Sequence, residues 1–175
     1  SVAARTIHKY GKVIINDISA GELDPLIVDV AAEHDVPYVA MHMKGDPRTM
    51  QSMTDYRDIV AEVVDYFRER TAQLRERGVR RIVVDPGFGF AKTLEQNYEL
   101  LRGLHSLAEL GYPVLAGVSR KSMIYKLLGT TPAEALNGTT ALHWECLRQG
   151  AVILRAHDTR EAVEVVRMFD QFMQA

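Results

Sequence analysis

Short, continuous runs of apolar residues recur along the chain, and each run is too short to form a helix. Five of them predict strands: Val13–Ile15, Tyr38–Met41, Ile82–Val84, Val114–Ala116 and Val152–Leu154. Runs without polar residues at alternate positions are typical of parallel strands that are covered on both faces. The pattern therefore predicts a parallel sheet.

The segments between these runs carry apolar residues at helical spacing. Residues 56–77 have one apolar stripe, with alternating charges on the outer face, and Gly78 follows, which predicts a helix that ends there. The segment 123–129 is predicted as a short helix stopped by glycine. Other helix starts are predicted from capping residues: Thr93 with Gln96, Thr131 with Pro132 and Glu134, and Asp158 with Glu161. Strand and helix alternate to the end of the chain, which predicts an α/β fold in one domain, residues 1–175.

Polar and small residues collect directly after each predicted strand. They are Asn16 and Asp17; His42, Lys44, Gly45 and Asp46; Asp85, Gly87 and Gly89; Ser119, Arg120 and Lys121; and Arg155, His157 and Asp158. The carboxyl ends of parallel strands meet at one edge of the sheet, so these turns predict one composed site. The turn 117–122 places two hydroxyls and two cations at a helix start, which suits an anion or an electron-rich ring. An ordinary solvated turn is the alternative for that segment.

Composition narrows the classes of function. The net charge of −2 gives no electrostatic reason to expect binding to nucleic acid or to a membrane surface. The single cysteine, Cys146, cannot form an intrachain disulfide, and no Cys/His cluster has zinc spacing, so we expect a cytoplasmic protein. No apolar run approaches membrane-spanning length, and neither a G-x-G-x-x-G motif nor a Walker loop occurs.

An ordered set of motifs resembles the dihydropteroate synthase family of pterin-binding enzymes. The motifs are INDIS (15–19), MHMKGDP (41–47), DPGFGFAK (85–92), GVSRKS (117–122) and RAHD (155–158). The resemblance covers nearly the whole chain from about Ile14. It implies a parallel (β/α)8 TIM-barrel type, with only about five βα units, the fourth to the eighth, in this chain and the N-terminal three missing. We therefore expect a fragment that is inactive alone.

The resemblance also implies a reaction and a set of roles. The family condenses 6-hydroxymethyl-7,8-dihydropterin pyrophosphate with 4-aminobenzoate, giving 7,8-dihydropteroate and pyrophosphate, and it is a sulfonamide target. The implied catalytic residues are Lys121, Arg155 and His157. The implied ligands of the pterin are Asn16, Met41, Asp85, Gly117, Lys121 and Arg155; those of aminobenzoate are Phe90, Lys121 and Ser122; those of pyrophosphate are Arg155 and His157. Mg²⁺ is implied as a cofactor whose ligand lies in the missing part, with none in this chain, and a homodimer through the C-terminal helices is implied as the assembly.

The residue types suit these roles, and several also have a purely structural interpretation. A carboxylate such as Asp85 can accept two N–H bonds from an aminopyrimidinone edge, and Arg155 and His157 alternate in an extended segment, so both can face one way. His42 is predicted to be a packed, hydrogen-bonded histidine rather than an acid or base. The structural alternatives are a turn at Asp85, an Asx turn at Asn16, a helix cap at Ser122, core packing at Met41 and Phe90, and a surface position for Lys121.

Two other functions remain open. The chain could be a non-catalytic pterin-binding or regulatory subunit that relies on a partner chain. It could also be the pterin-binding domain of a corrinoid methyltransferase. Lys121-Ser122 and Arg155-x-His157 argue against the methyltransferase, because methyl transfer has no pyrophosphate to hold.

Overall fold

The computed structural model of the chain describes residues 1–45, 48 and 52–174, and its strands all run parallel. They are β1 (Ile15–Asp17), β2 (Tyr38–Met41), β3 (Ile82–Asp85), β4 (Leu115–Ala116) and β5 (Ile153–Leu154). β1, β2 and β3 form one sheet, β4 and β5 form another, and a parallel bridge between Val84 and Val114 links the two. The strands therefore lie side by side in chain order.

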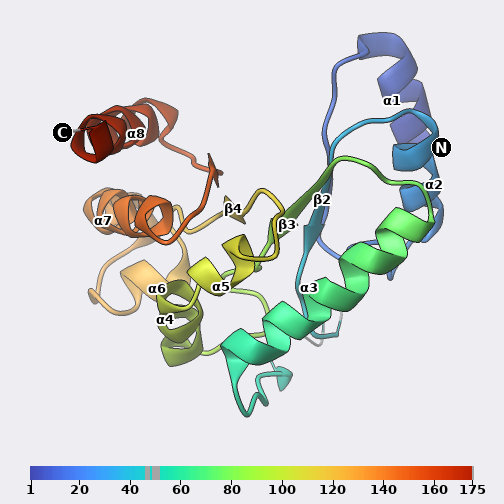
Figure 1. Ribbon diagram of the computed structural model, residues 1–175. Helices are drawn as coiled ribbons and strands as arrows, with labels where there is room; N and C mark the ends of the chain where they lie inside the picture. The colour runs from blue at the N-terminus through green and yellow to red at the C-terminus, as the bar shows by residue number, and fades with distance from the viewer. Residues whose placement is uncertain (46–47, 49–51, 175) are drawn as a thin grey trace.

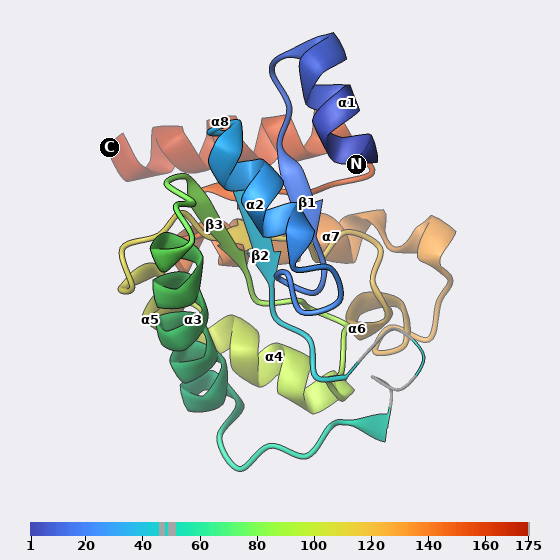
Figure 2. The ribbon, with the colours of Figure 1, turned by 90° about the vertical axis from the view of Figure 1, so that its right-hand side faces the viewer.

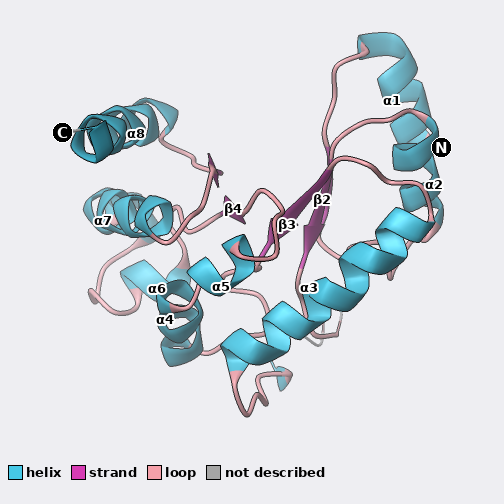
Figure 3. Cartoon of the chain, viewed as in Figure 1, coloured by secondary structure: helices cyan, strands magenta, loops and turns pink. Residues whose placement is uncertain are grey.

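Helices connect the strands and form an arc around them (Figures 1 and 3). They are α1 (Val2–Tyr10), α2 (Leu26–Glu33), α3 (Ile59–Glu76), α4 (Leu94–Arg102), α5 (His105–Ala108), α6 (Ser122–Tyr125), the 3₁₀ helix η2 (Pro132–Glu134), α7 (Leu136–Arg148) and α8 (Thr159–Gln174). In the turned view, α2 and α3 lie in front of the first three strands and α7 and α8 lie behind (Figure 2). None of the helices in the described part of the chain is long and apolar enough to cross a membrane.

The two sides of the strands are buried differently. Successive strand residues point to opposite sides, so Tyr38, Ala40 and Val84 join the main core under the helices. Val39, Val83 and Leu115 form a separate small cluster on the other side, which we call the inner face. Every residue of β2, β3 and β4 is buried, so the expectation of strands covered on both faces is confirmed for these three strands. The helices lie on the outer side of the arc, and the inner face is covered by side chains.

The predicted strand bounds are correct where a neighbouring strand provides backbone hydrogen bonds over the whole predicted segment. β2 has the predicted bounds, but β1 begins at Ile15, two residues later than predicted. The ladder starts there because the Ile15 amide donates to the Pro37 carbonyl directly before β2, while Ile14 is exposed. Asn16 and Asp17 consequently lie within the strand rather than after it.

The cap signals mark helix starts well, and α8 begins at Thr159, directly after Asp158, although the Asp158 side chain has another partner. Thr93 forms the predicted capping box with Gln96 and opens α4. Thr131 and Glu134 also form a capping box, but it opens η2, and α7 begins only at Leu136. The Asp158 carboxylate instead pairs with Arg120 across 2.8 Å, because a guanidinium offers a stronger charge-assisted partner than backbone amides.

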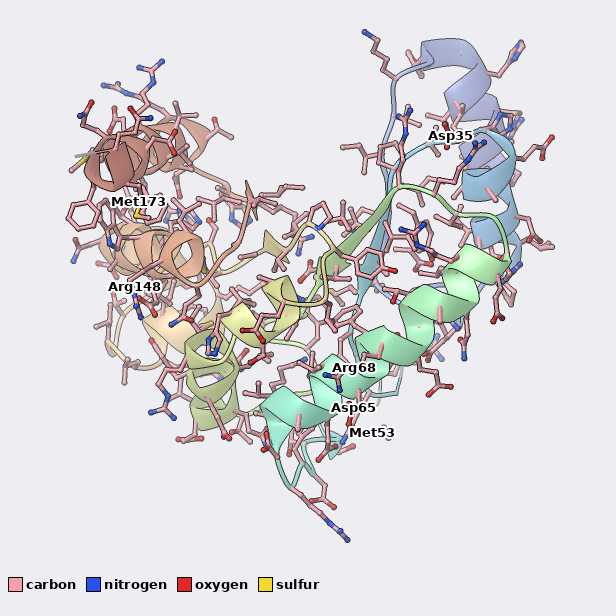
Figure 4. The ribbon with its side chains drawn as sticks, viewed as in Figure 1. Asp35, Met53, Asp65, Arg68, Arg148 and Met173 are labelled. Carbon is pink, nitrogen blue, oxygen red and sulfur yellow. The ribbon has the colours of Figure 1, made fainter. Side chains whose placement is uncertain are left out.

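Helix lengths are shorter than predicted at two places. The segment 56–77 forms α3 over Ile59–Glu76, because the Asp58 side chain accepts from the Ala61 amide and fixes the start. The predicted helix 123–129 continues regularly only to Tyr125 in α6. On α3, Asp65 and Arg68 form a 2.7 Å ion pair on the solvent side, as the predicted charged outer face requires (Figure 4).

Candidate active site at the carboxyl ends of the strands

The period of two along each strand brings predicted site residues to the inner face. Met41 and Asp85 are register partners at the ends of β2 and β3, two residues beyond Val39 and Val83. Gly117 follows Leu115 by two residues, and Arg155 follows Ile153 by two. The sequence pattern therefore places a carboxylate, a glycine and a guanidinium at one edge of the inner face.

Asp85 is fully buried, and its two oxygens differ. Oδ1 accepts a hydrogen bond from the Gly87 amide at 2.8 Å. Oδ2 lies 2.9 Å from Nη1 of Arg155, but the angles there do not make a hydrogen bond, so Oδ2 accepts none from the described residues. A buried carboxylate oxygen without a hydrogen bond is costly, and it is suited to receive a donor from a ligand.

Arg155 joins residues from three strands. Its Nη1 donates to Oδ1 of Asn16 at 3.0 Å and also faces Asp85. A Cβ on Gly117 would lie 2.6 Å from Nη2 of Arg155, so the glycine gives the guanidinium its space. The prediction that Gly117 leaves room for a flat group thus has a physical basis, and in this structure the flat group is Arg155.

Met41 and the turn after Asp85 pack together behind this arrangement. Met41 is 1% exposed. Gly87 has φ +68°, and a Cβ there would lie 2.1 Å from the His42 carbonyl oxygen, so only glycine fits the turn. The Asp-Pro-Gly turn therefore positions the Asp85 carboxylate. Asp85 can both shape the turn and bind a ligand, so these two interpretations do not exclude each other.

Lys121 and Phe90 form a second group. The Lys121 ammonium lies 4.8 Å from the centre of the Phe90 ring and donates to the Phe88 carbonyl oxygen. Burial lowers the pKa of Lys121 to about 8; the charge of Asp85 opposes this shift and that of Arg155 adds to it. Lys121 is half-buried rather than fully exposed, so it is not an ordinary surface lysine.

Ser122 lies beside this second group. It lines a cavity of about 240 Å³ together with Gly89, Asn97 and Lys126. The N-cap of α6 is Lys121 rather than Ser122, so the interpretation of Ser122 as the capping residue is wrong.

His157 and Arg120 are held away from Asp85. His157 is exposed, and its Nδ1 lies 3.0 Å from Oγ of the buried Ser119, which also accepts from the His157 amide. Within the described residues, no hydrogen bond joins His157 to Arg155. The Arg120 guanidinium makes two bonds to Asp158, so only one of the two cations of the turn, Lys121, faces the site.

Sequence reasoning gave no role to Lys92, although it lies in the motif 85–92, and named Ser119 only as a member of the turn after the fourth strand. Lys92 is 7% exposed, and its Nζ lies 3.1 Å from Nδ1 of His42. His42 packs edge-on against Tyr66 at 4.9 Å, which confirms the prediction of a packed, hydrogen-bonded histidine. The position of Lys92 at the end of a glycine-rich turn could have indicated that it belongs to the site. Its burial could not have been predicted, because lysines are usually exposed.

No group of three or more His, Cys, Asp or Glu side chains able to hold a metal occurs in residues 1–45, 48 and 52–174. The predicted turn residues Asp46 and Pro47 lie outside the described residues.

The chain is similar in sequence to several dihydropteroate synthases. The chain is 42% identical over 170 residues to dihydropteroate synthase of Synechocystis and 42% identical over 169 residues to that of Escherichia coli K12. Each match covers 95% of this chain, which spans about three fifths of the length of these curated relatives (59% and 60%).

A solved structure from Thermus thermophilus, dihydropteroate synthase in complex with 6HMPPP, superposes with a TM-score of 0.91 at 40% identity, covering 97% of this chain and 68% of that one. The same enzyme in complex with 4-aminobenzoate superposes with a TM-score of 0.92, at 40% identity and with 97% and 69% of the two chains covered. The model of the family described as pterin binding enzyme matches residues 1–157. With its parallel strands and the buried Asp85 at their carboxyl ends, the chain belongs to the pterin binding enzyme family.

Proposed function

We propose that the protein carrying this chain is a dihydropteroate synthase, a transferase of folate biosynthesis that condenses 6-hydroxymethyl-7,8-dihydropterin pyrophosphate with 4-aminobenzoate. The observation that carries the proposal is the buried Oδ2 of Asp85, which accepts no hydrogen bond from the described residues and has only the Arg155 guanidinium beside it, at 2.9 Å. The solved relatives in complex with 6HMPPP and with 4-aminobenzoate support both substrates.

The pterin is assigned to the group around Asp85. Its aminopyrimidinone edge offers N–H donors to Asp85, while the Asn16 amide presents both a donor and an acceptor. Met41 and Gly117 line the slot. In this structure the Arg155 guanidinium lies beside Asp85, where the pterin would bind. Pterin binding therefore replaces the N–H donors of Arg155 with those of the pterin. The displaced guanidinium then stacks on the pterin ring or binds the pyrophosphate.

Aminobenzoate is assigned to the second group. Its ring packs on Phe90, Lys121 borders both substrates, and Ser122 donates to the carboxylate from the cavity that it lines. This arrangement separates the pterin side at Asp85 from the aminobenzoate side at Phe90 by the turn 86–89.

The reaction needs orientation and charge stabilisation more than a new nucleophile. The aniline nitrogen attacks the pterin methylene carbon, the carbon–oxygen bond to pyrophosphate breaks, and pyrophosphate leaves with the bonding pair while the nitrogen loses a proton. Arg155 and His157 hold the charge that develops on pyrophosphate, and Lys121 orients the reactants. Arg155, as a bidentate fork, is the stronger phosphate ligand of the pair.

The remaining features follow from the resemblance. We propose that the five strand–helix units correspond to the fourth to eighth units of a (β/α)8 barrel and that the protein acts in the cytoplasm. Mg²⁺ accompanies pyrophosphate in this proposal on the strength of the resemblance alone, and no step above runs through it.

A homodimer through the C-terminal helices is also proposed. The helices α7 and α8 pack together, and Trp144 lies 5.3 Å from Phe169 and 5.6 Å from Phe172 between ring centres. Met168, Phe172 and Met173 on α8 are each 66% exposed, an apolar face that a second copy would cover. Phe172→Glu should convert a dimer to a monomer in sedimentation velocity; a monomeric parent protein contradicts this part of the proposal.

The function is tested with the protein expressed from the complete reading frame that contains these residues. We expect it to form 7,8-dihydropteroate from the two substrates, detected by mass spectrometry. Arg155→Ala should weaken binding of the pterin pyrophosphate by about 1.5–3 kcal/mol, more than it weakens binding of the bare pterin, because a charged hydrogen bond to pyrophosphate is lost.

The control is Arg148→Ala, which removes an exposed arginine that pairs with Glu145 on α7. Equal losses for both ligands in Arg155→Ala would indicate stacking rather than pyrophosphate binding. Tight pterin binding without product in the parent protein would instead indicate a non-catalytic pterin-binding subunit.

A further inference from the structure

In the turn between β3 and α4, the backbone of each of the four residues 87–90 is hydrogen-bonded to a side chain. Lys92 Nζ lies 3.1 Å from the Gly87 carbonyl oxygen and 2.9 Å from that of Phe90. Lys121 donates to the Phe88 carbonyl oxygen, and the Gly89 amide donates to Oδ1 of Asn97 at 2.6 Å. These four interactions fix the backbone of residues 87–90, which suggests that the exact position of this turn matters for the site.

Lys92 is the central member of this set, because it bonds to both ends of the turn. Its side chain is buried, and its third neighbour is Nδ1 of His42 at 3.1 Å. A charged ammonium has three donors for these three neighbours, with His42 Nδ1 as an acceptor. A neutral amine still donates to both carbonyls and accepts from a protonated Nδ1, so either state of Lys92 is fully satisfied.

The rest of the turn cannot hold its shape by itself. Ala91 has a φ of +50°, a left-handed conformation that an alanine rarely adopts, and its side chain is fully buried. Such a backbone persists only where surrounding contacts fix it. The bond from Lys92 to the Phe90 carbonyl is the contact directly next to Ala91.

We propose that Lys92 is a positioning residue for aminobenzoate: by bonding to the carbonyls of Gly87 and Phe90, it fixes the Phe90 ring under Lys121 where the aminobenzoate ring packs. This inference rests on the proposed function and adds to it a residue that acts by fixing the backbone beside Phe90. Lys92 is 7% exposed and borders the cavity that Ser122 lines, but its Nζ is engaged with Gly87, Phe90 and His42, so it acts through the turn that carries Phe90. The pterin side depends on it less, since Asp85 is set by β3 and by the Gly87 amide.

The test is Lys92→Met, which keeps the length and apolar stem but removes every donor. We expect the KM for 4-aminobenzoate to rise about ten- to a hundredfold, the range for losing hydrogen bonds of a charged group, while the Kd of the pterin pyrophosphate changes less than about threefold. Hydrogen exchange of the amides in residues 87–90 should speed up in the same variant. Lys12→Met, at an exposed lysine before β1, is the matched control.

Each outcome decides the inference. An unchanged KM for 4-aminobenzoate, equal losses for both substrates, or unchanged exchange at 87–90 would overturn it. If Lys92→Met does not fold, Lys92→Gln, which retains two donors, is judged by the same ratio of losses. A parent protein that forms no dihydropteroate overturns the proposed function, and the aminobenzoate role with it, before any variant is made.

Discussion

Two aspartates at the ends of strands in the same sheet have opposite surroundings. Asp17, at the end of β1, accepts four hydrogen bonds, from the Ser19 amide and hydroxyl, the Gly21 amide and the Tyr38 hydroxyl, at 2.6–2.9 Å. Asp85, at the end of β3, accepts one and keeps a buried oxygen without any.

Both aspartates lie at strand ends in the sequence, and this difference indicates that Asp17 has a structural role and Asp85 a ligand-binding one. Asp17 closes a turn and ties it to the core, and burial together with the Asp17 hydrogen bond raises the pKa of Tyr38. Asp85 is buried with an incomplete set of partners, which a folded protein retains only where a ligand or a moving group completes it. The following predictions test this contrast.

The largest effect is expected from Asp17→Asn. The new amide nitrogen faces donors only, so the free energy of unfolding should fall by about 2–4 kcal/mol. Urea unfolding followed by circular dichroism measures this loss. Binding of the pterin pyrophosphate by the molecules that remain folded should stay unchanged, and a loss of binding without a loss of stability would reverse the contrast.

The same substitution at the other aspartate should act on binding. Asp85→Asn is expected to weaken the pterin pyrophosphate by about 1–3 kcal/mol, because a charge-assisted acceptor is lost, while the unfolding free energy changes little. Titration calorimetry beside the same urea experiment gives both numbers. Unchanged affinity would remove Asp85 from the pterin site.

A smaller effect is expected from Gly117→Ala. The added methyl group meets the far end of the flexible Arg155 side chain, so the fold adjusts, and affinity for the pterin pyrophosphate should fall by about 1 kcal/mol. In a double-mutant cycle, the same change made in an Arg155→Ala background should have a smaller effect, because the displaced group is gone. Additive losses would mean that the alanine meets the ligand rather than Arg155.

The smallest effect is a pH dependence of stability that belongs to Lys92. Burial lowers its pKa to about 7, with the charge of Asp85 opposing the shift. Between pH 7 and its ordinary range the unfolded chain binds the proton that the folded chain has released, so stability rises with pH across that window. The unfolding free energy of the parent minus that of Lys92→Met should therefore increase from pH 6.5 to pH 9; a flat or falling difference contradicts the lowered pKa.

The sequence predicts those features that depend on local patterns. β2 and the Thr93 capping box follow from a few adjacent residues, and the predicted site residues Asp85, Arg155, Asn16 and Gly117 do come together. The inner face follows from the alternation of side chains once the strand ends are known.

What the sequence does not predict depends on distant partners. The start of β1 is set by Pro37, and the direction of Asp158 is set by Arg120, 38 positions earlier in the chain. The buried Lys92 has His42, 50 residues away, as one of its neighbours. The helices α1, α2 and α5 were not predicted, because they span only nine, eight and four residues and show no long apolar stripe, although Ser1 caps α1.

The two-residue step from the inner-face cluster to the site has a consequence for insertions and deletions. Asp85 lies two residues beyond Val83, so one inserted residue between them would turn the carboxylate toward the helices and an apolar side chain toward the ligand. The same holds between Leu115 and Gly117 and between Ile153 and Arg155. Length changes of even one residue in these segments should be excluded by selection more strictly than most substitutions, whereas the loops at the opposite ends of the strands can vary in length without disturbing the site.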